Sequence, residues 1–142
     1  MSTISIAGDM LRRHEGFSRW AYQDTVGKWT VGIGRNIDKN GGPGITEEEA
    51  LHLLANDLQN TSVAMEKTFP WFSGMNEARQ AAILDMAFNI GLPSFQRFRQ
   101  TIALLEQENY AAAADEMLRS TWAAQVGARA TELAGIIRTG EL

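Results

Sequence analysis

Two carboxylates near the start of the chain have positions that could cleave a glycosidic bond. Glu15 stands directly before Gly16, at the expected end of a helix over about residues 4–14, and Asp24 follows on a polar turn. Because Gly16 ends the helix between them, the two acids do not share a helix face and can face each other across a cleft. One protonated and one ionised carboxyl across a cleft is the arrangement that hydrolyses glycosides.

The spacing of these acids is weak evidence by itself. The chain has 17 acidic residues, so many pairs have a similar separation, and most such pairs are solvated surface groups. Whether the two acids can act together depends on the helices and strands that would hold them in place.

Two kinds of sequence follow one another along the chain. Seven of the 13 glycines lie between Gly16 and Gly44, among aromatic and β-branched residues, which predicts short strands and turns. From Thr46 onward, apolar residues recur at helical spacing, and Thr46 with Glu49 predicts a capping box. The later helices are expected over about 47–67, 76–90, 96–107, 110–120 and 127–138, with 76–90 as the central core helix.

Composition excludes several classes of function. There is no cysteine, which removes thiol nucleophiles, thiolate zinc sites and disulfides. The formal net charge of −4 gives no electrostatic reason to bind nucleic acid or an anionic membrane. His14 and His52 are two distant histidines without cysteine partners, so no metal and no cofactor are expected. No signal peptide or membrane span is recognised, so synthesis as a soluble cytoplasmic chain is expected.

The segment from Glu15 to Gly34 resembles the phage T4-type lysozymes of glycoside hydrolase family 24. The shared residues occur in order and without gaps, and they are Glu15-Gly16, Tyr22, Asp24-Thr25, Gly27, Thr30 and Gly32-Ile33-Gly34. The resemblance continues through later segments, which are 46–57, 79–91, 121–129 and 138–140. It implies an α+β, mostly helical fold in one domain. A small β-containing lobe (about 12–46), a connecting helix (about 47–68) and a helical lobe (about 69–142 with 1–11) are expected.

The resemblance also implies roles for individual residues. Glu15 would be the general acid, and Asp24 and Thr30 would position the attacking water in an inverting reaction. Arg129 falls where the family has an arginine able to pair with the catalytic acid. Five further residues fall where sugar contacts are expected, and only Phe88 among them matches by identity: Asn36, Phe88, Asn89, Thr101 and Glu116.

Three departures from the family pattern stand out. The stretch between Gly34 and Thr46 is short, so a reduced hairpin region with a possible missing strand is expected. Arg35 replaces a histidine whose acidic partner is retained as Asp57, which predicts an Arg35–Asp57 ion pair in its place. The chain is acidic, although many phage lysozymes are basic, so wall affinity must come from local contacts.

The expected activity is hydrolysis of the β-1,4 bond between N-acetylmuramic acid and N-acetylglucosamine in peptidoglycan by an endolysin. Two alternatives remain open. A lytic transglycosylase needs one catalytic acid and no activated water, so the presence of Asp24 and Thr30 argues against it. A catalytically silent wall-binding module of a phage structure needs no catalytic residues, so the presence of Glu15, Asp24 and Thr30 together argues against it. A monomer that reaches the periplasmic cell wall through a holin-type partner is expected.

Overall fold

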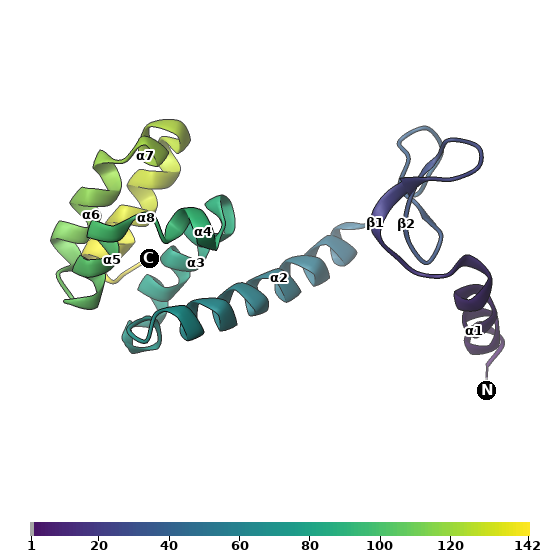
Figure 1. Cartoon of the computed structure of the whole chain (residues 1–142), viewed down its shortest axis with the longest axis horizontal. Coiled ribbons are helices and arrows are strands. Elements are labelled where there is room, and N and C mark those ends of the chain that lie inside the picture. Colours follow the sequence, from purple (N-terminus) through teal and green to yellow (C-terminus); the bar gives the residue numbers. More distant parts are fainter. Residues whose placement is uncertain (1) are drawn as a thin grey trace. The chain divides into compact units, whose positions relative to one another are not determined.

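The computed structural model describes residues 2–142 (Figure 1). It contains two compact units, Met1–Leu53 and Leu54–Leu142. The expected α+β, mostly helical class is confirmed, with one small antiparallel sheet in the first unit and most of the helices in the second. Within the described part of the chain, none of the helices is both long and apolar enough to cross a membrane.

The first unit begins with a helix and continues into a three-stranded sheet. Helix α1 spans Thr3–Glu15 and is capped by the side chain of Ser2. Strands β1 (Ser18–Gln23), β2 (Trp29–Gly32) and β3 (Arg35–Asn36) follow in the order β1-β2-β3, with antiparallel neighbours. The short third strand agrees with the reduced hairpin region expected from the sequence.

Helix α2 spans Glu47–Thr68 and starts with the predicted capping box. The backbone N–H of Glu49 donates to the hydroxyl of Thr46 at 3.1 Å, and the N–H of Thr46 donates to the carboxylate of Glu49 at 2.9 Å. Both bonds satisfy donors that would otherwise be free at the start of a helix. The position of this helix start is therefore fixed by its own sequence.

The second unit packs short helices around one apolar core. After a 3-10 turn (Phe72–Gly74), its helices are α3 (Glu77–Ile90), α4 (Leu92–Phe95), α5 (Arg99–Glu106), α6 (Tyr110–Arg119), α7 (Thr121–Val126) and α8 (Ala128–Thr139). Helix α3 contributes four buried residues to this core, which agrees with its expected central place. The largest fully buried side chains include Phe72, Phe95, Met86 and Ile137.

The helices after α3 differ from the prediction at several places, and the short helix α4 was not predicted. The helix expected over 96–107 begins only at Arg99, because Phe98 adopts a non-helical conformation (φ −77°, ψ 57°) after α4. Helix α7 was not predicted, and the side chain of Ser120 caps it by accepting from the N–H of Ala123. By its contacts α1 belongs to the first unit. The expectation that residues 1–11 pack with the helical lobe depends on how the two units are placed, and it stays a prediction.

The start of α3 holds the end of α8. The guanidinium of Arg79 donates to the carbonyls of Ile137 at 2.8 Å and Arg138 at 3.4 Å, and it lies 3.8 Å from the ring centre of Tyr110. Asn76 caps its own helix and donates to the carbonyl of Gly140 at 3.0 Å. These bonds satisfy carbonyls that the last turn of α8 leaves without helical partners.

Arg79→Met is therefore expected to lower the free energy of unfolding by about 1–3 kcal/mol, because it leaves these carbonyls unpaired. Urea unfolding followed by circular dichroism measures the change. Lys67→Met, an exposed cation at the end of α2, is the control and should change the midpoint little. Equal effects of the two substitutions would contradict the assigned role of Arg79.

Candidate functional site

The side chain of Glu15 lies against the backbone of Gly34. A Cβ atom at position 34 would lie 3.0 Å from the carboxyl carbon of Glu15 and 3.1 Å from its Oε2. Gly34 also has a φ of +68°, which side chains rarely allow. The second glycine of the Gly-Ile-Gly segment therefore leaves the space that the carboxyl group of Glu15 occupies.

Asp24 is held by the backbone of the turn between β1 and β2. Its Oδ1 accepts hydrogen bonds from the N–H groups of Val26 at 3.0 Å and Lys28 at 2.8 Å. The backbone N–H of Asp24 in turn donates to the carbonyl of Lys28 at 2.9 Å. No hydrogen bond among the described residues reaches Oδ2, so this oxygen is left to accept from another group.

Thr30 lies next to this turn and, at 5% exposed, is one of the two buried polar side chains among residues 2–142. Its hydroxyl donates to the carbonyl of Lys28 at 3.0 Å, so the main chain of Lys28 contacts both Asp24 and Thr30. Thr30 is also paired with Tyr22 on β1 and with Asn36 on β3. Since opposed residues of an antiparallel pair point to the same face, these three side chains form a row. The expected Asn36 is thus placed beside Thr30.

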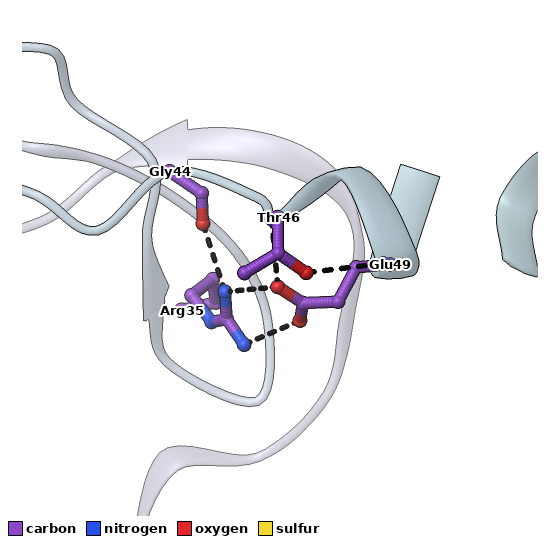
Figure 2. Close-up of polar contacts among 4 residues, drawn as sticks. All are labelled: Arg35, Gly44, Thr46 and Glu49. Atoms are coloured by element: carbon purple, nitrogen blue, oxygen red, sulfur yellow. Dashed lines mark hydrogen bonds and ion pairs between the residues drawn. The ribbon is translucent and has the colours of Figure 1, made fainter. Parts of the chain in front are cut away.

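Arg35 joins strand β3 to the start of helix α2 (Figure 2). Its Nη1 donates to the carbonyl of Gly44 at 2.8 Å and to Glu49 at 3.0 Å, and its Nη2 donates to the second oxygen of Glu49. The acid paired with Arg35 is therefore Glu49, and the prediction of Asp57 was wrong. Asp57 lies eight residues farther along α2, about 12 Å by the rise of an α-helix.

These contacts change the acid strength of Glu49. The hydrogen bond from Arg35, followed by that from the backbone of Thr46, lowers the pKa of Glu49 from its ordinary value of 4.5 to about 2. The carboxylate is therefore ionised at any pH at which the enzyme would work. It caps α2 and pairs with Arg35 at the same time.

Four of the expected substrate contacts lie in the second unit. Thr101 and Glu116 both line one hollow of about 250 Å³, so the structure brings these two together. Phe88 is 46% exposed and lines a separate hollow of about 370 Å³, as does Asp57. Asn89 accepts a hydrogen bond from the indole nitrogen of Trp122 at 2.8 Å, which fixes its amide.

Arg129 forms its ion pair inside the second unit. Its Nε donates to Oδ1 of Asp85 at 2.8 Å, and its Nη2 reaches the carbonyl of Asp85 at 3.4 Å. Both side chains are about half exposed. The sequence analysis did not consider Asp85, and its place six residues after Arg79 on the predicted core helix gave no reason to do so.

Sequence reasoning missed other residues that shape the site. Gly34 was noted only as part of a motif, although its missing side chain makes room for Glu15. Lys28 could not be found from its residue type, because its main chain makes the contacts. Glu49 was found only in its capping role, and the short loop before Thr46 was the available signal that Arg35 returns to the start of α2.

The fold and the sequence comparisons together identify the class of protein. A mostly helical α+β fold in which a three-stranded antiparallel sheet precedes the helical unit is consistent with a lysozyme-like protein. The sequence model of the phage lysozyme family matches residues 12–139, so the chain belongs to this family. It is accordingly a glycoside hydrolase of the lysozyme type, with peptidoglycan as its substrate class.

Individual relatives agree with this assignment. The chain is 28% identical to a probable T4-type lysozyme 1 from Dictyostelium discoideum, over 98% of this chain and 97% of that protein. It is 30% identical to an endolysin from Acyrthosiphon pisum secondary endosymbiont phage 1, over 91% of this chain and 86% of that protein. It is also 31% identical to the pre-baseplate central spike protein Gp5 of Enterobacteria phage T4, where 94% of this chain matches only 28% of the relative.

Gly34→Ala is expected to lower activity sharply, because the added methyl group would displace the carboxyl group of Glu15. Gly32→Ala is the matched control, since Gly32 has nearly the same φ (+69°) but nothing within 4 Å of an added Cβ. Both variants carry the backbone strain, so equal thermal stabilities with unequal rates on peptidoglycan would support the role of Gly34. Equal losses of rate would contradict it.

Glu49→Gln is expected to remove part of the acid dependence of stability. Because the pKa of Glu49 is lowered in the folded protein, its contribution is present above about pH 4.5 and is lost as the pH falls toward 2. The variant should have a lower urea midpoint than the wild type at pH 7, and the difference should vanish near pH 2. Glu48→Gln, in the same helical turn, should show no such convergence.

Proposed function

We propose that the enzyme hydrolyses the β-1,4 bond between N-acetylmuramic acid and N-acetylglucosamine with inversion, and that Glu15 donates the proton to the leaving oxygen. The position of Glu15 at the end of α1, with its carboxyl group against Gly34, supports this role. A carboxyl group whose range of positions is limited by a close backbone contact loses less freedom when substrate binds, and this reduces the cost of reaching the transition state. This contact is the observation that carries the proposal.

Asp24 and Thr30 then hold the attacking water. The carboxylate of Asp24 is oriented through Oδ1 by two backbone N–H groups, which leaves Oδ2 to accept the proton of a water molecule. The hydroxyl of Thr30 donates to the carbonyl of Lys28, so its lone pairs are free to accept a hydrogen bond from that water. A base and a second partner together orient water for attack on the face opposite the leaving group.

Further residues of each unit are proposed as substrate contacts. In the first unit, Asn36 lies in the row that contains Thr30. In the second unit, Phe88 offers an exposed ring for a sugar face. The amide oxygen of Asn89 accepts from Trp122, and its amide nitrogen takes part in no hydrogen bond within the part of the chain that the structure describes. Arg129 is proposed as the cation that pairs with Glu15, with Asp85 holding its Nε.

A silent structural module is the alternative that one finding favours, because a relative is named as a central spike protein. A lytic transglycosylase is the second alternative, since it would also need Glu15. The sugar ends of the products distinguish hydrolysis, transglycosylation and a silent module. Hydrolysis leaves reducing ends, transglycosylation leaves anhydro-muramic ends, and a silent module leaves none.

We also propose that the enzyme acts as a monomer on the periplasmic cell wall after synthesis in the host cytoplasm, with a holin-type partner for release. The resemblance to an endolysin over most of both chains supports this use. Lysis of cells expressing the enzyme with and without a co-expressed holin tests it. Equal lysis in both cases would contradict the need for such a partner.

Glu15→Gln is expected to reduce the rate of peptidoglycan hydrolysis by roughly 100-fold or more, since general acid catalysis contributes at least that much. Asp24→Asn should also lose most activity, while binding of peptidoglycan persists in both variants. The measurement is the release of reducing ends from purified peptidoglycan, with Asp9→Asn, an exposed acid on α1, as control. Full activity of Glu15→Gln would refute its role, and anhydro ends from the wild type would refute hydrolysis.

A further inference from the structure

The peptide group between Lys28 and Trp29 joins the two residues that are proposed to hold the attacking water. Its carbonyl, which belongs to Lys28, accepts from the backbone N–H of Asp24 at 2.9 Å and from the hydroxyl of Thr30 at 3.0 Å. A peptide group is planar, so the direction of its N–H fixes the direction of its carbonyl. Whatever holds the N–H of Trp29 therefore also orients the acceptor that Asp24 and Thr30 share.

The N–H of Trp29 donates to a side chain, that of Asp38, at 3.2 Å. Strand β3 ends at Asn36, one residue before the position opposite Trp29. Ile37 occupies that position, and its N–H donates to the carbonyl of Trp29 at 2.8 Å; residues paired in this way normally exchange two such bonds. Within residues 2–142 the return bond goes to Oδ2 of Asp38, so a carboxylate replaces the carbonyl of a strand.

The carboxylate of Asp38 is itself held by its own loop. Its Oδ1 accepts from the backbone N–H of Asn40 at 2.9 Å, and its backbone N–H donates to the side-chain oxygen of Asn36 at 2.9 Å. Its carbonyl accepts from the N–H of Gly42 at 2.8 Å. The amine of Lys28 donates to the carbonyl of Asn40 at 2.8 Å, which ties the same loop to the turn. The two carboxylate oxygens thus have different partners, one in the loop and one in the sheet.

These contacts favour the charged form of Asp38. The hydrogen bond from the backbone of Asn40, followed by that from the backbone of Trp29, lowers the pKa of Asp38 below its ordinary value of 3.8. A hydrogen bond to an ionised acceptor is stronger than one between neutral groups, and hydrogen bonds in a chain polarise one another. The charge on Asp38 therefore makes the carbonyl of Lys28 a better acceptor, and this increases the electron density that the oxygen of Thr30 offers to a water molecule.

We propose that Asp38 is a positioning residue for the attacking water, and that it acts on Asp24 and Thr30 through the Lys28–Trp29 peptide group. The inference rests on the proposed function, in which Asp24 and Thr30 hold that water. Among the described hydrogen bonds, none joins the side chain of Asp38 directly to either residue, so its effect passes through the main chain. The loop that carries Asp38 is short, and its carboxylate supplies the acceptor that a longer third strand would provide.

The first test is Asp38→Asn, which keeps the size of the side chain but removes its charge and one of its two acceptor oxygens. We expect kcat on purified peptidoglycan to fall roughly tenfold, the loss expected when a charge-assisted hydrogen bond is weakened. KM should stay unchanged, because the backbone N–H that donates to Asn36 is retained. Glu48→Gln removes the same charge from an exposed position of the first unit and should leave both kinetic constants unchanged.

A second comparison separates positioning from simple support of the loop. Thr30→Val lacks the hydroxyl that donates to the carbonyl of Lys28, so Asp38→Asn should lower kcat by a smaller factor in Thr30→Val than in the wild type. If Asp38 only supported the loop, the factor would be the same in both backgrounds. An unchanged kcat in Asp38→Asn, or equal factors in the two backgrounds, would overturn the inference.

An NMR measurement on the wild type does not depend on whether the variants fold. A scalar coupling across the hydrogen bond between the amide nitrogen of Trp29 and the carboxyl carbon of Asp38 is expected, and its absence would also overturn the inference. The activity of Asp24→Asn tests the proposed function separately. Full activity of Asp24→Asn would reject that function and with it this role of Asp38. An inactive Asp24→Asn together with a fully active Asp38→Asn would reject the role of Asp38 alone.

Discussion

The pairing of Arg35 with the first turn of α2 is the contact on which the geometry of the site in the first unit depends. It connects strand β3, the loop that ends at Gly44 and the helix start at Glu49 through one planar group. Because β3 pairs with β2, and β2 carries Thr30, this contact also limits the movement of the row formed by Tyr22, Thr30 and Asn36. A short, otherwise weak sheet is in this way attached to a long helix.

The proposed catalytic groups contact the main chain more than they contact other side chains. Asp24 accepts from two backbone N–H groups, Thr30 donates to a backbone carbonyl, and Glu15 lies against a glycine. Main-chain groups in a closed turn lose little conformational freedom when substrate binds. Such an arrangement is preorganised in the sense that enzymes need for proton transfer.

How far sequence alone leads is visible at particular residues. The cap at Thr46 and the helix ended by Gly91 follow local rules, because each depends on residues within a few positions. The acids at positions 15 and 24 were singled out through the resemblance of their segment to a family, since their spacing is weak evidence by itself. The partner of Arg35 could not be chosen this way, since two acids on the same helix were available and only the path of the loop decides between them. The non-helical Phe98 and the partner of Arg129 likewise depend on packing across the unit.

The turn at Lys28 has a consequence for natural and engineered variation. Its N–H and its carbonyl, rather than its amine, contact Asp24 and Thr30. A substitution at position 28 other than proline, which has no N–H, therefore keeps the contacts to these two neighbours. It loses only the hydrogen bond that the amine of Lys28 donates to the carbonyl of Asn40 at 2.8 Å. Conservation scores measure side chains, and here they would overlook the main-chain atoms that contact Asp24 and Thr30.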